Sequence, residues 1–324
     1  MRLSAASRAT RAAVSGAATI AAVAALAACG NDSTQANQGS LGQELKGAKF
    51  TVGSKDFSES IILGQITMQL LSGHGATVID KTNIKGSTNT RTALMSGDID
   101  MYWEYTGTGW ITYLKKTTPI PDPKQQYDAV AKEDLSANKV VWGAPAPLNN
   151  TYAFAIRKEK ASELGVKTLS DLKQLVSSKP DQATFCIESE FSTRDDGWPG
   201  LQKAYGIDVP KNNVKLLDTG VIYTETKKGQ TCNFGEVFAT DGRIASLGLT
   251  VLDDDKKFFP VYNAALTLRQ DTDQKYQDIR KIIDPVAAKL TNEVMQQLNA
   301  KVDADGQEPS KVAKDWLTSQ GFLK

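Results

Sequence analysis

Histidine and cysteine are scarce in this chain of 324 residues, which contains one His and three Cys. A Ser-His-Asp site needs a histidine base, and the lone His74 is poorly placed for one. The chain also lacks a Gly-x-Ser-x-Gly sequence, a phosphate-binding glycine loop and a dinucleotide-binding fingerprint. We therefore expect neither an enzyme nor a bound metal or cofactor. A secreted hydrolase that uses adjacent acids such as Asp195 and Asp196 is the least supported alternative.

An excess of basic charge is absent as well. Lys and Arg number 38 against 37 Asp and Glu, which gives a net charge of +1 at pH 7. Proteins that bind nucleic acids carry a strongly basic face, so we expect no nucleic-acid partner. Aromatic residues make up only 7% of the chain, which makes a local cluster of rings informative.

The N-terminal residues indicate export. Three arginines precede an apolar stretch of small residues, 12–28, that is short for a transmembrane helix. The sequence Leu-Ala-Ala-Cys that ends at Cys29 resembles a bacterial lipobox, which implies removal of signal peptide 1–28 and a lipid on Cys29. An ordinary signal peptide with an accidental cysteine is the alternative. We expect residues 29–43 to be a flexible tether that holds the protein on the extracytoplasmic side of the cell membrane.

Two cysteines, Cys186 and Cys232, remain after Cys29. Because an exported protein reaches an oxidising compartment, we expect them to form a disulfide bond. The bond would close a loop of roughly 45 residues and contribute ~3 to 4 kcal/mol in the chain-entropy account. Two buried thiols are the alternative.

Strand-like and helix-like segments alternate in the mature chain, which predicts an α/β fold. The first half follows the order strand, helix, strand, helix, strand, which is typical of a largely parallel sheet covered by helices. Ligands at such sheets bind beyond the carboxyl ends of the strands, so residues 54–57 and 105–108 are candidates for a binding site. The segments are predicted at 48–54, 58–71 with Ser58 as its cap, 77–80, 89–96 and 98–104.

A second unit begins near Pro145. After the segment Tyr262-Asn-Ala-Ala265 we expect the chain to become helical, with packing helices at 284–298 and 310–321. About 280 residues follow the tether, which is enough for two compact lobes. The other predicted segments of the second unit are strands at 152–157, 183–187, 234–241 and 249–252 and a helix at 201–205.

The segment 98–113 concentrates aromatic rings beside a glycine turn. Glycine lets the backbone approach a ligand closely, and ring faces attract a cation with ~0.5 to 2 kcal/mol per good contact. A cation-binding pocket and alternate rings that pack a core are both compatible with this pattern. We expect Tyr102, Trp103 and Trp110 to lie in the core or at the lip of the pocket.

Six short motifs occur in order between residue 48 and the C-terminus. They are Gly53-Ser-Lys-Asp-Phe-Ser-Glu59, Ile62-Leu-Gly64, Ser96-Gly-Asp-Ile-Asp100, Glu104-Tyr-Thr-Gly-Thr108, Thr240-Asp-Gly-Arg-Ile244 and Phe258-Phe-Pro-Val-Tyr-Asn-Ala-Ala265. The ordered set resembles the substrate-binding proteins of ABC importers for glycine betaine, choline, carnitine and related quaternary ammonium solutes.

The resemblance implies the two-lobed periplasmic-binding-protein fold of type II. Each lobe would be a mixed, mostly parallel sheet flanked by helices, and two crossing strands would form the hinge between the lobes. Lobe 1 would comprise residues 44–148 and 263–324, and lobe 2 would comprise residues 149–262. The ligand would be held where the lobes close.

In this family a cage of aromatic rings holds the trimethylammonium group. The matching motifs place Tyr105, Tyr152, Phe238 and Tyr262 at the cage. Phe238 stands where many members have tyrosine, so one ring would lack a hydroxyl. The chemistry agrees, because a quaternary ammonium group has no N–H and must be recognised by ring faces.

The same resemblance assigns a carboxylate-binding role to Lys55, Thr108 and Arg194. A guanidinium group suits a bidentate grip on a carboxylate. Two alternatives remain open: Lys55 as a surface lysine, and Arg194 as part of a structural ion pair with a neighbouring acid such as Glu190 or Asp196.

The predicted function is capture of glycine betaine or a related quaternary ammonium osmolyte and its delivery to an ABC permease. The protein would act as a lipid-anchored monomer. The alternative is choline or another small solute, which would leave the carboxylate site unused.

Overall fold

The computed structural model describes residues 41–324 with the exception of 117 and 119. The predicted signal peptide, Cys29 and nearly all of the predicted tether lie outside the described residues. Within the described part of the chain, no helix is both long and apolar enough to cross a membrane.

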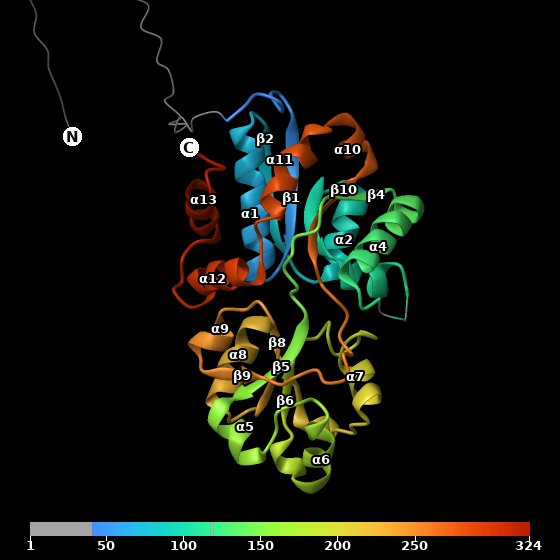
Figure 1. The fold of residues 1–324 in the computed structure, drawn as a ribbon, viewed down its shortest axis with the longest axis vertical. Coiled ribbons are helices and arrows are strands. Elements are labelled where there is room, and N and C mark those ends of the chain that lie inside the picture. The colour runs from blue at the N-terminus through green and yellow to red at the C-terminus, as the bar shows by residue number, and fades with distance from the viewer. Residues whose placement is uncertain (1–40, 117, 119) are drawn as a thin grey trace, which may run out of the picture. The chain divides into compact units, whose positions relative to one another are not determined.

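Two five-stranded sheets organise the described residues (Figure 1). Their strand orders are β2-β1-β3-β10-β4 and β7-β6-β8-β5-β9. Both sheets are mixed, because β10 in the first and β5 in the second run antiparallel to both of their neighbours. The first sheet contains β1 (Lys49–Lys55), β2 (Thr77–Ile84), β3 (Met101–Tyr105), β4 (Val140–Trp142) and β10 (Ala264–Arg269). The second contains β5 (Tyr152–Arg157), β6 (Phe185–Ile187), β7 (Val214–Leu216), β8 (Phe234–Phe238) and β9 (Leu249–Val251).

We call the part of the chain built on the first sheet lobe 1 and the part built on the second sheet lobe 2. This arrangement confirms the predicted two-lobed α/β fold. The predicted lobe bounds, 44–148 with 263–324 and 149–262, remain a proposal.

Helices cover both sheets (Figure 1). In lobe 1 they are α1 (Ser58–Gly73), α2 (Ser87–Ser96), α3 (Thr106–Thr108), α4 (Pro123–Asn138), α10 (Gln270–Lys275), α11 (Asp278–Ala287), α12 (Asn292–Asp303) and α13 (Pro309–Ser319), with a π-helical turn at Gly109–Tyr113. In lobe 2 they are α5 (Lys158–Leu164), α6 (Asp171–Ser178), α7 (Trp198–Tyr205), α8 (Thr219–Lys228) and α9 (Arg243–Ser246).

Side chains of β3 contribute to the cores on both faces of the first sheet. Successive side chains of a strand point to opposite faces. Tyr102 therefore joins the core with residues of α2 and α4, whereas Trp103 joins the core with residues of α1, α11 and α13. Both rings are fully buried, as is expected for core residues.

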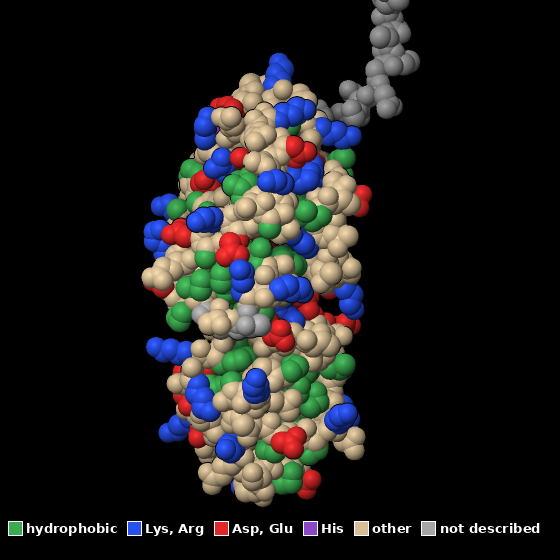
Figure 2. Space-filling view, turned by 90° about the vertical axis from the view of Figure 1, so that its right-hand side faces the viewer, with side chains coloured by type: hydrophobic (Ala, Val, Ile, Leu, Met, Phe, Trp, Pro, Cys, Tyr) green, Lys and Arg blue, Asp and Glu red, His purple; other side chains and the backbone are tan. Residues whose placement is uncertain are grey.

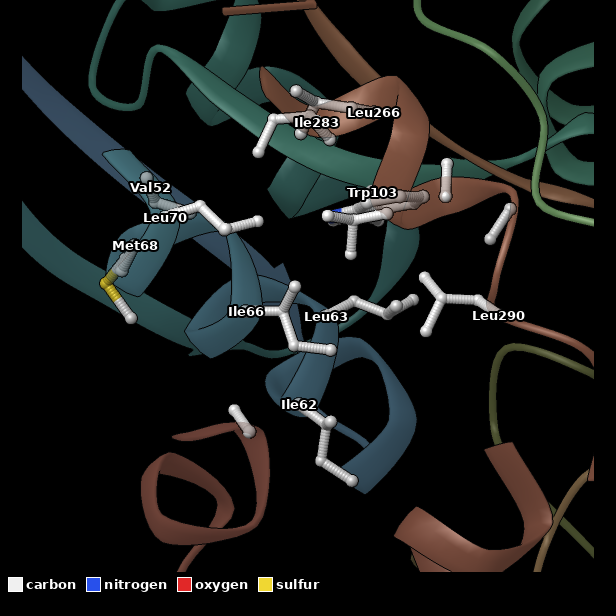
Figure 3. Packing of buried hydrophobic residues seen from close by; sticks show 14 of the residues in the cluster. Val52, Ile62, Leu63, Ile66, Met68, Leu70, Trp103, Leu266, Ile283 and Leu290 are labelled. Atoms are coloured by element: carbon white, nitrogen blue, oxygen red, sulfur yellow. The ribbon is translucent and has the colours of Figure 1, made fainter. Parts of the chain in front are cut away.

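Helix α1 supplies the largest apolar contribution to the core of lobe 1. In Figure 3, Leu63 and Ile66 of α1 lie on the same side of Trp103, and the side chain of Leu63 points toward Leu290. Burial of such a side chain stabilises the fold by roughly 1.5 to 3 kcal/mol. The indole N–H of Trp103 donates to the hydroxyl of Thr67 at 2.8 Å, so its polar atom is also satisfied.

Lobe 2 has its own core and a cross-link. The predicted disulfide bond between Cys186 and Cys232 is confirmed. Cys186 lies in β6 and Cys232 lies just before β8, the strand next to β6 in the sheet. The bond therefore ties together two neighbouring segments that are 46 residues apart in the sequence.

Two connecting segments join the lobes, near residues 143–151 and 260–263. They run side by side, because Asn150 N donates to Tyr262 O at 3.1 Å and Tyr262 N donates to the side-chain oxygen of Asn149 at 2.8 Å. Ala146 N also donates to Ala264 O at 2.8 Å. This pair of segments corresponds to the predicted hinge.

Charged side chains of both signs intermingle on the surface. Figure 2 shows Lys and Arg interspersed with Asp and Glu over one face of the molecule. The exposed large hydrophobic side chains come from six separate elements, so apolar surface is scattered. They are Ile79, Met95, Leu135, Leu216, Val221 and Val251.

Two predictions for the region after Tyr262 are wrong. Residues 264–269 form β10 rather than helix, although Ala and Leu favour helices. Pairing with β3 and β4 overrides that preference, because β10 lies between them in the sheet. The helix predicted at 284–298 is two helices, α11 and α12, and Thr291 caps the second by accepting a hydrogen bond from Val294 N.

Three smaller differences between the predictions and the structure concern helices α1, α4 and α8. Ser58 does not cap α1, since its hydroxyl donates to Asp303 at 2.5 Å. Helices α4 and α8 carry only a weak apolar stripe, and neither was predicted.

Candidate ligand site between the two lobes

A cavity lies where the two lobes meet. Its lining comes from the carboxyl ends of β1 and β3, from the ends of β6 and β8, and from the connecting segments. Because β1 and β3 are parallel neighbours, their carboxyl ends meet at one edge of the sheet, as the sequence pattern predicts. The cavity has a volume of about 60 Å³.

Five aromatic rings line this cavity and form a continuous series. Their centroid separations are 5.8 Å for Tyr105–Phe57, 5.1 Å for Phe57–Phe238, 5.4 Å for Phe238–Tyr152 and 5.4 Å for Tyr152–Tyr262. Tyr152 and Phe238 face each other in register across β5 and β8 of lobe 2, whereas Phe57 and Tyr105 belong to lobe 1. Ring surface from both lobes therefore meets at the cavity.

Glu59 links one of these rings to a contact between the lobes. The Tyr105 hydroxyl donates to Glu59 Oε1 at 2.9 Å, and Glu59 Oε2 accepts from the hydroxyl of Thr240 at 2.5 Å. Asn299 of α12 also donates to Glu59 Oε2, at 3.1 Å. Burial raises the pKa of Glu59, and its hydrogen bonds oppose that shift. Because Thr240 follows β8, the bond to Glu59 crosses from lobe 2 to lobe 1.

Tyr262 is held by a second buried network. Its hydroxyl donates to Asp196 Oδ2 at 2.5 Å, and Arg194 donates to Asp196 through Nε at 2.7 Å and Nη2 at 2.5 Å. Arg194 Nη1 also donates to Glu190 at 2.8 Å. These are the ion pairs that the alternative interpretation of Arg194 predicted, and the guanidinium lies 5.6 Å from the centroid of the Tyr152 ring.

Lys55 is buried, with 4% of its surface exposed, so the interpretation as a surface lysine is wrong. Its Nζ donates to Glu104 Oε1 at 2.6 Å and lies 5.2 Å from the centroid of the Tyr105 ring. Glu104 also accepts hydrogen bonds from the hydroxyls of Tyr102 and Tyr113, at 2.7 and 2.8 Å. The positive charge of Lys55 at the cavity is therefore balanced by a buried carboxylate.

Carboxyl groups dominate the rest of the polar lining. Asp56, Glu188, Glu190 and Glu236 all line the cavity. Burial raises the pKa of Glu236 to about 8, so this side chain is largely protonated at neutral pH. Burial also raises the pKa of Glu188. The wall that lobe 2 contributes is thus acidic, and its charge depends on how these groups share their protons.

Glu190 differs from the other two glutamates. Burial opposes its ionisation, but the charges of Lys55 and Arg194 and a hydrogen bond from Ser87 lower its pKa below the usual value. One oxygen accepts from Arg194, and the other accepts from the backbone N–H of Ser87 in lobe 1 at 2.9 Å. Both oxygens of Glu190 are therefore engaged, and the second makes another contact between the lobes.

Most of the predicted ligand-site residues come together at the cavity. The lining includes Lys55, Tyr105, Thr108, Tyr152, Phe238 and Tyr262, whereas Arg194 lies behind it and is not among the described lining residues. Their contact with a ligand stays a prediction.

Sequence reasoning missed the three glutamates as lining residues. Phe57 lies in the candidate segment 54–57, directly after β1, but was not predicted as one of the cage rings. Glu236 offered a signal, because a charged residue within the apolar strand β8 is seldom buried without a partner.

The two lobes have the fold of the two-lobed periplasmic binding proteins. The solved structure of apo YehZ from Escherichia coli is similar, with a TM-score of 0.63 and 32% identity over 85% of this chain and 99% of that chain. Residues 48–319 match the family model described as the substrate binding domain of ABC-type glycine betaine transport system, and the chain belongs to this family.

Two curated relatives cover most of this chain. A glycine-betaine-binding protein of Pseudomonas aeruginosa is 37% identical over 277 residues, which are 84% of this chain and 88% of the relative. An ergothioneine transport permease/ergothioneine binding protein, EgtU, of Helicobacter pylori is 36% identical over 272 residues, which are 84% of this chain and 47% of the relative. The resemblance drawn from the six motifs is thereby confirmed.

Proposed function

We propose that this protein is the solute receptor of an ABC importer, which captures glycine betaine or a related quaternary ammonium solute between its lobes and delivers it to the permease. The observation that carries the proposal is the series of five aromatic rings around a small cavity between the lobes, in a chain of this family. The relatives are named for glycine betaine and ergothioneine, and both compounds contain a trimethylammonium group. We infer that the protein is a transport receptor and not an enzyme.

The rings supply what a quaternary ammonium group needs. The group is cationic and lacks N–H donors, so attraction to ring faces is the interaction open to it, at ~0.5 to 2 kcal/mol per contact. The volume of about 60 Å³ is smaller than the roughly 150 Å³ of an engineered cavity that holds benzene. We therefore expect the rings to move apart as the ammonium group enters.

The polar end of the ligand would meet Lys55 and Thr108, which line the same cavity. The guanidinium of Arg194 is occupied by two carboxylates, which favours a supporting role through Asp196 and Tyr262 over a direct grip on the ligand. Choline, which has no carboxylate, is the second candidate ligand. The acidic wall of lobe 2 favours such a cation over a zwitterion.

We also propose that a lipid on Cys29 anchors the receptor as a monomer at the outer surface of the membrane, with residues 29–43 as the tether. The lipobox-like sequence before Cys29 supports this proposal. Substitution Cys29→Ala should release the chain from the membrane fraction and preserve ligand binding. A variant that stays bound to the membrane would show that the lipid is not the anchor.

Thermal unfolding of residues 31–324 with added solutes tests the proposed function. A ligand at a hundred times its dissociation constant adds ~2.7 kcal/mol of stability. Glycine betaine, choline or carnitine should raise the melting temperature, whereas glycine, which lacks the methyl groups, should not. The proposal fails if no quaternary ammonium compound stabilises the protein or if glycine stabilises it equally.

A further inference from the structure

The acidic wall of the cavity exceeds what recognition of an ammonium group requires. Glu236 lies in β8, and Glu188 directly follows β6, the parallel neighbour of β8. Both side chains line the cavity. Ring faces alone can hold an alkylated ammonium group, so these two carboxyl groups need an explanation of their own.

Hydrogen bonds within lobe 2 hold both carboxyl groups from the backbone. Glu188 N donates to Glu236 Oε2 at 2.7 Å, and Glu190 N donates to Glu188 Oε2. Across residues 41–324, the undescribed 117 and 119 aside, no side chain donates a hydrogen bond to Glu188 or Glu236, and no Lys or Arg forms an ion pair with either. Hydrogen bonds from the backbone N–H groups of Ser189 and Phe191 also act on the Glu188 carboxyl group and oppose the rise of its pKa. Both carboxyl groups are thus held by backbone N–H groups alone.

Asn150 adds a third acceptor. Its side chain lines the cavity and is 5% exposed, and its side-chain oxygen has no hydrogen-bond partner. Nearby donors are engaged elsewhere, since Lys55 donates to Glu104 and the hydroxyl of Tyr262 donates to Asp196. A buried acceptor without a donor costs free energy, so this lining favours a ligand that brings a donor.

We propose that Glu188 and Glu236 form a subsite that accepts a hydrogen bond from the ligand, and that the protein selects quaternary ammonium cations bearing an O–H or N–H group. The inference rests on the proposed function, because the rings fix the position of the ammonium group. The donor would belong to a hydroxyalkyl chain or to a nitrogen heterocycle.

Matched pairs of cations separate the donor from size and charge. Choline and propyltrimethylammonium have nearly the same shape and the same charge, but only choline has a hydroxyl. A second pair is 3-hydroxypropyltrimethylammonium and butyltrimethylammonium. It places the hydroxyl one carbon farther from the ammonium nitrogen. In calorimetric titration of the wild-type protein, the hydroxyl member of at least one pair should bind about ten-fold more tightly or better, because the alkyl cation leaves a buried acceptor without a donor.

Variants then assign the preference to these residues. Glu188→Leu and Glu236→Leu remove the acceptors and should bring the affinity ratio of each pair close to one. Glu236→Gln keeps an acceptor oxygen and should retain the preference, which also controls for general damage to the fold.

The possible outcomes are distinct. If none of the four cations binds, the proposed function fails. If the alkyl cations bind as tightly as the hydroxyl cations, the proposed function stands and the donor subsite is refuted. If the hydroxyl preference survives in both leucine variants, the donor is bound elsewhere, and the assignment to Glu188 and Glu236 is overturned.

Discussion

Substitution of Thr240 by valine should weaken ligand binding by loosening the contact between the lobes. The hydroxyl of Thr240 in lobe 2 donates to Glu59 Oε2 in lobe 1 at 2.5 Å. Valine has a similar shape but no hydroxyl, so the substitution removes this bond and leaves the packing nearly unchanged. Glu59 also holds the ring of Tyr105, so the loss acts on the cavity as well as on closure.

The size of the effect follows from burial and charge. Thr240 and Glu59 are 1% and 2% exposed, so water cannot replace the lost bond. Burial raises the pKa of Glu59, so we treat its carboxyl group as intermediate between a neutral and a charged acceptor. Hydrogen bonds between neutral groups contribute up to ~1.5 kcal/mol, and those to charged groups contribute ~1.5 kcal/mol or more. We therefore expect a loss of ~1.5 kcal/mol, which corresponds to a dissociation constant about ten-fold higher.

Calorimetric titration with glycine betaine and choline measures the loss. Thr267→Val is the matched control, because Thr267 is also buried and its hydroxyl donates to Tyr102 O within lobe 1 at 2.8 Å. The control should lower the melting temperature and leave the affinity unchanged. Equal losses of affinity in the two variants, or none in Thr240→Val, would refute the role of this bond in closure.

Three further predictions concern stability and the second buried network. Replacement of both Cys186 and Cys232 by serine should lower the free energy of unfolding by about 4 kcal/mol, because their bond spans 46 residues, and an unchanged urea midpoint would contradict this. Since the pKa of Glu236 rises from 4.5 to about 8 on folding, its stabilising contribution is complete below pH 4.5 and is lost as the pH rises through about 8. Wild type should therefore lose about 1.4 kcal/mol more per pH unit than Glu236→Gln across this window in urea titrations, and parallel slopes would contradict the shift. Arg194→Ala should weaken glycine betaine and choline alike, because it acts through a neighbouring carboxylate. A loss confined to glycine betaine would instead place Arg194 on the ligand carboxylate.

Elements with a clear local pattern were predicted from the sequence. Residues Tyr152–Arg157 form β5 with the predicted bounds, and the apolar residues of 58–71 form most of α1. The strand β10 was missed because its identity depends on two partners, β3 and β4, that are far away in the sequence. Local preference for helix in Ala and Leu gives the opposite answer there.

The candidate site also has a part that could be predicted from the sequence and a part that could not. The positions of Tyr105 and Tyr262 at the cavity could be predicted, because both residues lie in motifs that match the family. The partners of those rings could not, since Glu59 meets Thr240 and Asn299 at separations of 181 and 240 residues. No sequence pattern indicates a contact between residues that are so far apart in the chain. The hydrogen-bond partners of these polar groups are therefore visible only in the structure.

The central claim is that ring faces hold a quaternary ammonium group, and replacing its nitrogen by carbon tests this most directly. Choline and 3,3-dimethyl-1-butanol, and glycine betaine and 3,3-dimethylbutanoate, differ mainly in that positive charge. With ~0.5 kcal/mol from each of the four predicted cage rings, which exclude Phe57, the ammonium member of a pair should bind with at least ~2 kcal/mol more free energy, or about thirty-fold more tightly, in calorimetric titration. Equal or tighter binding of both carbon analogues would contradict the account.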